Sequence, residues 1–262
     1  MIKTIKSRIP KPIKFQYRKY KAYIYSFLSL KKNDKLKVLI FAQGRTGSTL
    51  LENLICSTGY FRASGELLSP VKGRITFPYR YVDGLTRLKS DANFIFHLKV
   101  YHLTRDRKNS IDPNIFLKRL KKDNWKIIYL KRTNLLNHAL SNIVAEKRQN
   151  YRKFDSIKEN ITLNLDLNEL KNGINERQKF AKQDKLALKD IGSFSLEYEK
   201  DLEKSEFHQQ SIDSILEYLN LEKRIVRTKH KKVNALTHKE LIENYDDFYQ
   251  LLKDNNWLKY LN

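Results

Sequence analysis

The segment from residue 37 to residue 57 constrains the fold more than any other part of the chain. It begins with the apolar run KVLIFAQ (37–43), passes through a turn that holds Gly44 and Gly47, and continues as STLLENLICS (48–57). A continuous apolar run with β-branched residues is typical of a strand buried on both faces of a parallel sheet. The apolar residues of 48–57 recur at helical spacing. Strand, glycine turn and helix in this order predict an α/β protein.

Later segments of the chain repeat the same two patterns. Strands are predicted at 93–103, 125–131 and 193–198, because apolar residues there alternate or run continuously. Helices are predicted at 135–144, at 166–190 and around 212–219, and a last helix is expected to open at a capping box of Thr237 and Glu240. We therefore predict a three-layer α/β fold, in which helices cover both faces of a central parallel sheet, within one domain of residues 37–262.

Composition excludes several classes of protein and favours an anionic partner. The 262-residue chain is 40% hydrophobic and carries 52 Lys and Arg against 29 Asp and Glu, a formal charge of +23. Its one cysteine, Cys56, cannot form an internal disulfide or a multi-cysteine zinc site. No apolar run approaches the roughly 20 residues that cross a bilayer, and no secretory signal is recognisable. We expect a cytoplasmic protein without a metal centre.

Residues 1–36 form a separate, strongly basic segment. Residues 1–37 contain twelve Lys or Arg and a single acidic residue, Asp34. Apolar residues recur among the basic ones at near-helical spacing: Tyr17, Tyr20, Ile24, Phe27 and Leu28. This pattern predicts a basic amphipathic helix. Three roles stay open for it: it lies on an anionic membrane and makes the protein membrane-peripheral, it binds an acidic glycan, or it only covers the core.

The turn after the first strand has the chemistry of an anion-binding site. Gly44 and Gly47 allow the backbone to curl so that amide groups converge, and the N-terminus of the next helix adds a partial positive charge. Arg45 supplies a full charge, and Ser48 and Thr49 supply hydroxyl donors. The turn differs from the P-loop of nucleotide triphosphatases, which requires a lysine where this chain has Ser48. The alternative is an ordinary connection between a strand and a helix.

A second candidate site follows the strand at 125–131. Arg132 leaves the carboxyl end of this strand, and Ser141 lies more than two turns along the next helix. Both side chains are therefore expected at the carboxyl edge of the sheet, where open α/β folds bind ligands. Taken alone, the pair is also compatible with a solvated arginine and an ordinary helix serine. A basic run at 227–232 is either a loop that closes on a phosphate or a solvated run of charge.

Together these segments resemble the sulfotransferase family that uses 3′-phosphoadenosine 5′-phosphosulfate (PAPS), over roughly residues 37–255. Arg45-Thr-Gly-Ser-Thr49 is similar to the family's 5′-phosphosulfate motif, and Arg132 with Ser141 to its 3′-phosphate motif. The nine-residue spacing of this pair resembles the bacterial carbohydrate branch, such as the trehalose and nodulation-factor sulfotransferases. The resemblance implies a P-loop-like sulfotransferase fold with these cofactor-binding residues: Gly44, Arg45, Thr46, Gly47, Ser48, Thr49, Arg132, Ser141, Lys229, Lys231 and Lys232.

The resemblance also implies a set of catalytic residues: Glu66, Arg45, Lys99 and His102. The segment GELLSP (65–70) is similar to the one whose carboxylate acts as general base in the carbohydrate branch. Burial is expected to raise the pKa of Glu66 toward the working pH. His97 and His102 are competing bases, because the cytosolic branch uses a histidine after a lysine comparable to Lys99. Each histidine alone is more typical of a structural role, and Glu52 is expected to be structural.

The activity implied is transfer of a sulfuryl group from PAPS, without a metal, to a hydroxyl of a carbohydrate or lipid-linked glycan acceptor. The acceptor pocket is expected in variable loops such as 60–90 and 146–165. Two other functions stay open: a small-molecule kinase with a degenerate phosphate loop, and a basic nucleic-acid-binding protein. The missing Lys-Ser/Thr pair disfavours the kinase. Nucleic acid is disfavoured because much of the charge outside the N-terminal segment has a use in the cofactor site.

Overall fold

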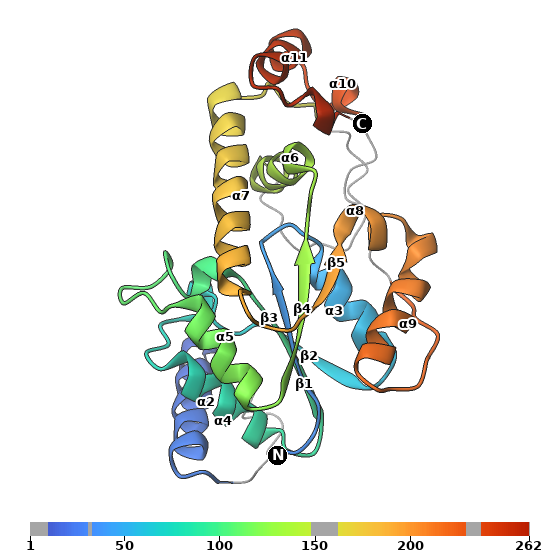
Figure 1. The fold of residues 1–262 in the computed structure, drawn as a ribbon. Helices are drawn as coiled ribbons and strands as arrows, with labels where there is room; N and C mark the ends of the chain where they lie inside the picture. The colour runs from blue at the N-terminus through green and yellow to red at the C-terminus, as the bar shows by residue number, and fades with distance from the viewer. Residues whose placement is uncertain (1–9, 31–32, 148–161, 229–236, 262) are drawn as a thin grey trace.

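A five-stranded, all-parallel sheet forms the centre of the computed structural model, which describes residues 10–30, 33–147, 162–228 and 237–261 (Figure 1). The strands lie in the order β2-β3-β1-β4-β5. Their bounds are β1 Lys37–Ala42, β2 Phe61–Glu66, β3 Asn93–Leu98, β4 Trp125–Lys131 and β5 Phe194–Glu197. Because β1 is the middle strand, the turn that follows it lies at the middle of the carboxyl edge, the usual ligand edge of such sheets.

Helices cover both faces of this sheet, which confirms the predicted three-layer α/β class (Figure 1). One face carries α3 (Ser48–Ser57) and α9 (His208–Tyr218), and the other carries α4 (Pro78–Leu88), α5 (Pro113–Lys122) and the end of α7 (Leu167–Ala187). The side chains of β1 alternate between the two layers. Leu39 and Phe41 join the cluster with α4 and α5, while Val38 and Ile40 join the cluster with α3 and α9. All four are fully buried, and each such burial contributes about 1.5–3 kcal/mol.

A third apolar cluster lies beyond the carboxyl edge of the sheet. It joins α6 (Leu135–Lys147), the first half of α7, α10 (His238–Leu241) and α11 (Tyr245–Asp254). Leu140, Ile174 and Phe248 are buried in it. Shorter helical pieces are α8 Tyr198–Asp201 and the 3-10 turns Pro70–Lys72, Val100–His102, Ser205–Phe207 and Leu258–Tyr260. This third cluster fixes α6, the helix that carries Ser141, above the sheet edge.

Several elements differ from the sequence predictions. The strand predicted at 93–103 ends at Leu98. Residues 60–90, expected to be loops, hold β2 and α4; β2 (FRASGE) is an edge strand with mostly small and polar residues, so no apolar pattern marks it. The helix α5 has no counterpart in the predictions. The capping box of Thr237 and Glu240 forms, but it opens only the short α10, and Ile242 then pairs with Leu163 before α11 begins.

The N-terminal segment forms α2 (Lys11–Phe27), a helix as predicted, which packs on α4 (Figure 1). Ala22 and Ser26 are fully buried, and the Ser26 hydroxyl donates to Asp83 at 2.6 Å. A Cβ atom added to Gly84 would lie 1.8 Å from the carbonyl oxygen of Ala22, so the two helices touch through their backbones. Within the part of the chain that the structure describes, no helix has the length and apolarity to cross a membrane.

Replacing Gly84 by alanine is expected to lower the free energy of unfolding by about 1–3 kcal/mol, because the added methyl group must push α2 away from α4. Gly192→Ala is the matched control, since a Cβ atom at Gly192 meets nothing within 4 Å. Urea unfolding followed by circular dichroism measures both variants. Equal stabilities would contradict the close packing of α2.

Candidate functional site

The turn between β1 and α3 has a backbone shape that few sequences adopt. Arg45 has a φ of 67° and Gly47 a φ of 86°, so two residues of the turn are left-handed. The buried Thr46 hydroxyl donates to the carbonyl oxygen of Gln43 at 2.7 Å and closes the turn from within. Ser48 begins α3, and the first amides of a helix have no partner inside it. Such a turn is suited to binding an anion.

Gly44 is held from two sides by His138 and Tyr101, neither of which the sequence patterns identify. The Nε2 atom of the buried His138 lies 2.6 Å from the Gly44 carbonyl oxygen, and the Gly44 amide donates to the Tyr101 hydroxyl at 3.2 Å. Burial, followed by the charge of Arg177, lowers the pKa of His138 well below its usual value, so a neutral ring donates from Nε2. The one sequence signal for His138 is its position three residues before Ser141 on the same helix.

The structure brings the two predicted phosphate motifs together. Nη1 of Arg132 donates to the carbonyl oxygen of Arg45 at 3.1 Å, and Nε of Arg45 donates to the Ser141 hydroxyl at 3.3 Å. The Arg132 guanidinium also lies 4.6 Å from the ring centroid of Tyr198. That ring covers Gly47, where an added Cβ atom would lie 2.8 Å from it. Arg45, Arg132 and Ser141 therefore form one cluster beside the turn.

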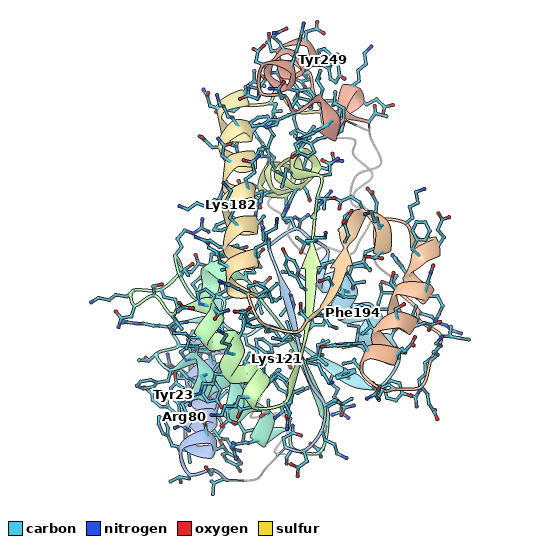
Figure 2. The ribbon with its side chains drawn as sticks, viewed as in Figure 1. Tyr23, Arg80, Lys121, Lys182, Phe194 and Tyr249 are labelled. Carbon is cyan, nitrogen blue, oxygen red and sulfur yellow. The ribbon has the colours of Figure 1, made fainter. Side chains whose placement is uncertain are left out.

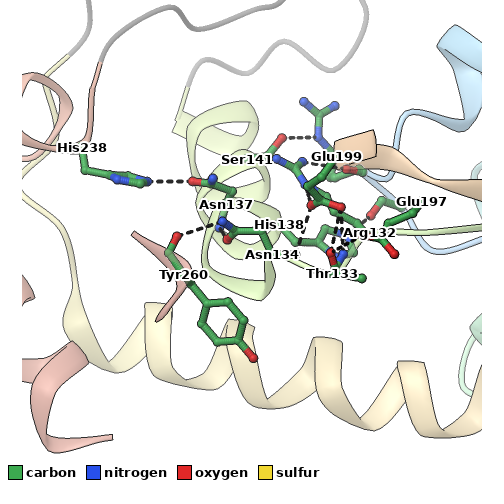
Figure 3. A network of polar contacts seen from close by, with 12 residues as sticks. Arg132, Thr133, Asn134, Asn137, His138, Ser141, Glu197, Glu199, His238 and Tyr260 are labelled. Atoms are coloured by element: carbon green, nitrogen blue, oxygen red, sulfur yellow. Dashed lines mark hydrogen bonds and ion pairs between the residues drawn. The ribbon is translucent and has the colours of Figure 1, made fainter. Parts of the chain in front are cut away.

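Glu199 of α8 fixes this cluster from the other side (Figure 3). Its carboxylate accepts hydrogen bonds from the backbone amides of Thr133 and Asn134 and lies 3.5 Å from Nε of Arg132. A carboxylate is favourable at this position, just before α6, because of the helix dipole. Burial nevertheless lowers the pKa of Arg132. A further anion beside Arg132 would therefore stabilise its charged form.

On the opposite side of the turn, Lys99 connects Gly44 with Glu66. Nζ of Lys99 lies 2.9 Å from Oε1 of Glu66, and a Cβ atom added to Gly44 would lie 3.3 Å from the same Nζ. Nε2 of His102 lies 3.7 Å from Oε2 of Glu66. The end of β2 thus places the candidate base near the turn, and the segment after β3 supplies its two basic neighbours.

The pKa of Glu66 is lowered rather than raised, which corrects the expectation from sequence. Burial raises this pKa, but the charge and hydrogen bond of Lys99, together with the charges of His97 and His102, outweigh burial. Glu66 is therefore an ionised carboxylate at neutral pH, paired with Lys99. Loss of the Lys99 contact would raise its proton affinity.

His97 pairs with Glu52 of α3. Nε2 of His97 lies 3.3 Å from Oε2 of Glu52, and Oε1 of Glu52 accepts hydrogen bonds from the amides of Ser64 and Gly65 at 3.1 and 2.8 Å. Burial raises the pKa of Glu52, but the contacts with His97 and the two amides lower it overall. These amides belong to the irregular end of β2, where its pairing with β3 shifts register before Glu66. Glu52 therefore supports the strand end that carries the candidate base.

The remaining predicted site residues have different placements. Ser48 is buried and Thr49 exposed in the first turn of α3. Lys229, Lys231 and Lys232 lie outside the described residues. Across the described ranges, no group of three or more His, Cys, Asp or Glu side chains is arranged to hold a metal ion.

Comparisons with known proteins give remote structural similarities. No family model matches the chain, and no curated protein matches it. A sulfotransferase from Alicyclobacillus acidocaldarius is similar at 11% identity and a TM-score of 0.48, covering 87% of this chain and 95% of that one. A sulfotransferase domain from the curacin biosynthetic pathway is similar at 14% identity and a TM-score of 0.43, covering 73% of this chain and 76% of that one. At these values neither similarity decides a function.

A buried carboxylate lies behind the turn. Asp184 of α7 is 1% exposed, and Oδ2 accepts a hydrogen bond from the Gln43 side chain at 3.2 Å. Burial raises the pKa of Asp184 to about 7, although the bond from Gln43 acts in the opposite direction. The folded state therefore favours the protonated acid. Its contribution to stability is complete below the unfolded pKa of 3.8 and is lost as the pH rises through about 7.

Asp184→Asn is expected to raise the free energy of unfolding at about pH 8 by about 2–4 kcal/mol, because one pKa unit corresponds to about 1.4 kcal/mol. Below about pH 4 the variant should differ little from the wild type. Asp91→Asn, at an exposed position, is the control. Urea unfolding across this pH range gives the comparison, and an unchanged pH dependence in Asp184→Asn would contradict the assignment.

Proposed function

We propose that this chain is a PAPS-dependent sulfotransferase that transfers a sulfuryl group to a hydroxyl of a carbohydrate or lipid-linked glycan. The observation that carries the proposal is the position of the turn at 44–49 between two basic side chains, Lys99 on one side and Arg132 on the other. A donor with a phosphosulfate at one end and a 3′-phosphate at the other requires two neighbouring anion-binding sites, one for each end. The motif resemblance supports the same choice.

In this proposal the turn residues hold the 5′-phosphosulfate. The left-handed Gly47 shapes the turn, and the amides of Ser48 and Thr49 donate from the helix N-terminus. Arg45 adds a full charge. A sulfuryl group carries less negative charge than a phosphoryl group, so fixed basic side chains and helix amides are sufficient to stabilise it.

Arg132 and Ser141 hold the 3′-phosphate in the same proposal, and Lys229, Lys231 and Lys232 are assigned to the same phosphate by the motif resemblance alone. Arg132 suits this role because its guanidinium is largely buried, and burial lowers its pKa in spite of the nearby carboxylates of Glu199 and Glu203. Ser141 suits it because its hydroxyl accepts a hydrogen bond from Arg45, whose carbonyl oxygen accepts one from Arg132.

Glu66 acts as the general base of the proposed transfer. Its carboxylate takes the proton of the acceptor hydroxyl while the acceptor oxygen bonds to sulfur and the bond from sulfur to the bridging phosphate oxygen of PAPS breaks. Lys99 stabilises the negative charge that remains on the phosphate. When Lys99 turns from Glu66 toward this anion, the lowered pKa of Glu66 rises, which makes the carboxylate a stronger base. Donor binding and base strength thus depend on one ion pair.

The full chain is expected to bind 3′-phosphoadenosine 5′-phosphate with about micromolar or tighter affinity without magnesium. Arg132→Ala should weaken binding about 10- to 100-fold, because a hydrogen bond to a charged group contributes about 1.5–3 kcal/mol. Arg62→Ala removes the same charge from an exposed position on β2 and should bind as the wild type does. Isothermal titration calorimetry measures all three proteins.

Failure of the wild-type chain to bind this nucleotide would contradict the proposed function. Protection from thermal unfolding by ATP with magnesium, and by no other nucleotide, would support a small-molecule kinase instead. Tight binding to duplex DNA with a steep salt dependence would support a nucleic-acid-binding protein.

Glu66→Gln is expected to keep the nucleotide affinity and to lower sulfate transfer by about 100-fold or more, since a general base contributes about 10²- to 10⁴-fold. Glu222→Gln, at an exposed position, is the control and should transfer normally. Transfer of labelled sulfate from PAPS to a panel of glycans gives the rates and also identifies the acceptor. Unimpaired turnover in Glu66→Gln would show that another residue is the general base. The transfer rate of His102→Asn would then be measured.

A further inference from the structure

The outer face of α2 carries a continuous apolar stripe. Five residues spaced at i, i+4, i+7, i+11 and i+14 share one side of the helix and are called the α2 stripe: Ile13, Tyr17, Tyr20, Ile24 and Phe27. Each is between 52% and 69% exposed. This spacing usually marks the face that a helix buries against its own core. Here the stripe faces solvent, so covering the core does not explain it.

The direction of the α2 stripe is fixed by the packing of the opposite face. Ala22 and Ser26, on the other side of the helix, are fully buried against α4. The backbone contact between Ala22 and Gly84 leaves no space for a side chain. Phe15, also on this side, lies with its ring centroid 6.4 Å from that of Tyr81. Rotation of α2 to bury the stripe would break these contacts. The packing of α2 on α4 therefore keeps the stripe exposed.

Basic side chains border the α2 stripe. Nζ of Lys21 lies 5.9 Å from the ring centroid of Tyr17, and Nζ of Lys19 lies 5.0 Å from that of Tyr20. Lys14 continues the edge that Lys21 occupies. Residues 10–30 contain no acidic side chain. Long basic side chains of this kind lay their stems along apolar surface while the ammonium groups reach a polar partner.

The same surface continues onto the start of α4. Phe77 is 53% exposed and lies edge-on to Phe27, with ring centroids 6.1 Å apart. The Arg80 guanidinium lies 5.0 Å from the Phe27 ring centroid. Tyr23 and Arg80 mark this junction of the two helices in Figure 2. An apolar, aromatic centre with a cationic border therefore extends over two elements.

We propose that the α2 stripe, together with Phe77 and Arg80, docks on the surface of an anionic lipid bilayer with the helix axis along the membrane plane. The apolar side chains enter the boundary between headgroups and acyl chains, while the bordering cations pair with lipid phosphates and carboxylates. Charge complementarity favours lipid over a second copy of this chain, because a symmetric contact would bring the basic borders of two copies together. A nucleic acid would meet an apolar centre where it requires a basic one.

The full chain is expected to float with phosphatidylcholine vesicles that contain about one third phosphatidylserine, and much less with pure phosphatidylcholine vesicles. Ile24→Glu places a negative charge in the centre of the α2 stripe and should reduce binding to the anionic vesicles at least about tenfold. Ile225→Glu is the matched control, because Ile225 is 77% exposed in the loop after α9 and the substitution adds the same charge. Thermal unfolding checks that both variants fold.

Absence of binding by the wild type to anionic vesicles, or equal losses in the two variants, would overturn the proposal. A dimer in lipid-free solution that Ile24→Glu dissociates would also overturn it, since the stripe would then belong to a second copy. Binding to duplex DNA that Ile24→Glu abolishes would assign the surface to nucleic acid. Ile24 lies outside the proposed nucleotide site, so nucleotide affinity is expected to stay unchanged in Ile24→Glu. A result that overturns membrane docking therefore does not affect the proposed function.

Discussion

The candidate site depends on the fixed backbone of the turn after β1. His138 holds the carbonyl of Gly44, and Tyr101 holds its amide. Because β1 is the middle strand, the segment after β3 brings Lys99 to one side of this turn, and β4 brings Arg132 to the other. A displacement of Gly44 would therefore separate the two basic groups from each other and from the helix N-terminus between them.

Carboxylates balance part of the positive charge of the site. Lys99 contacts Glu66, and Arg132 contacts Glu199, which also binds the backbone before α6. These carboxylates stabilise the cationic cluster in the folded chain, while burial still lowers the pKa of Arg132. In the proposed function, an anionic ligand that replaces Glu66 as the partner of Lys99 would free that carboxylate to accept a proton. The charges that attract such a ligand therefore also set the proton affinity of the candidate base.

Part of this arrangement follows from local sequence patterns. The predicted strand at 125–131 and the predicted helix at 48–57 have these bounds in the structure, because each is a continuous apolar run or a clear helical stripe. The strand β2 gives no such signal, since an edge strand can expose polar residues on both sides. The direction of the pKa shift of Glu66 could not be predicted either. It depends on the 2.9 Å contact with Lys99, a residue of another strand connection.

By itself, the sequence determined the α/β class, the position of the glycine turn and the helical character of the N-terminal segment, because all three depend on spacing between neighbours in the chain. Only the tertiary structure decided that His138 and Tyr101 meet at Gly44, and that the α2 stripe points to solvent. Those facts depend on strand order and on one backbone contact between two helices. Segments far apart in the sequence make these contacts, and no local periodicity records them.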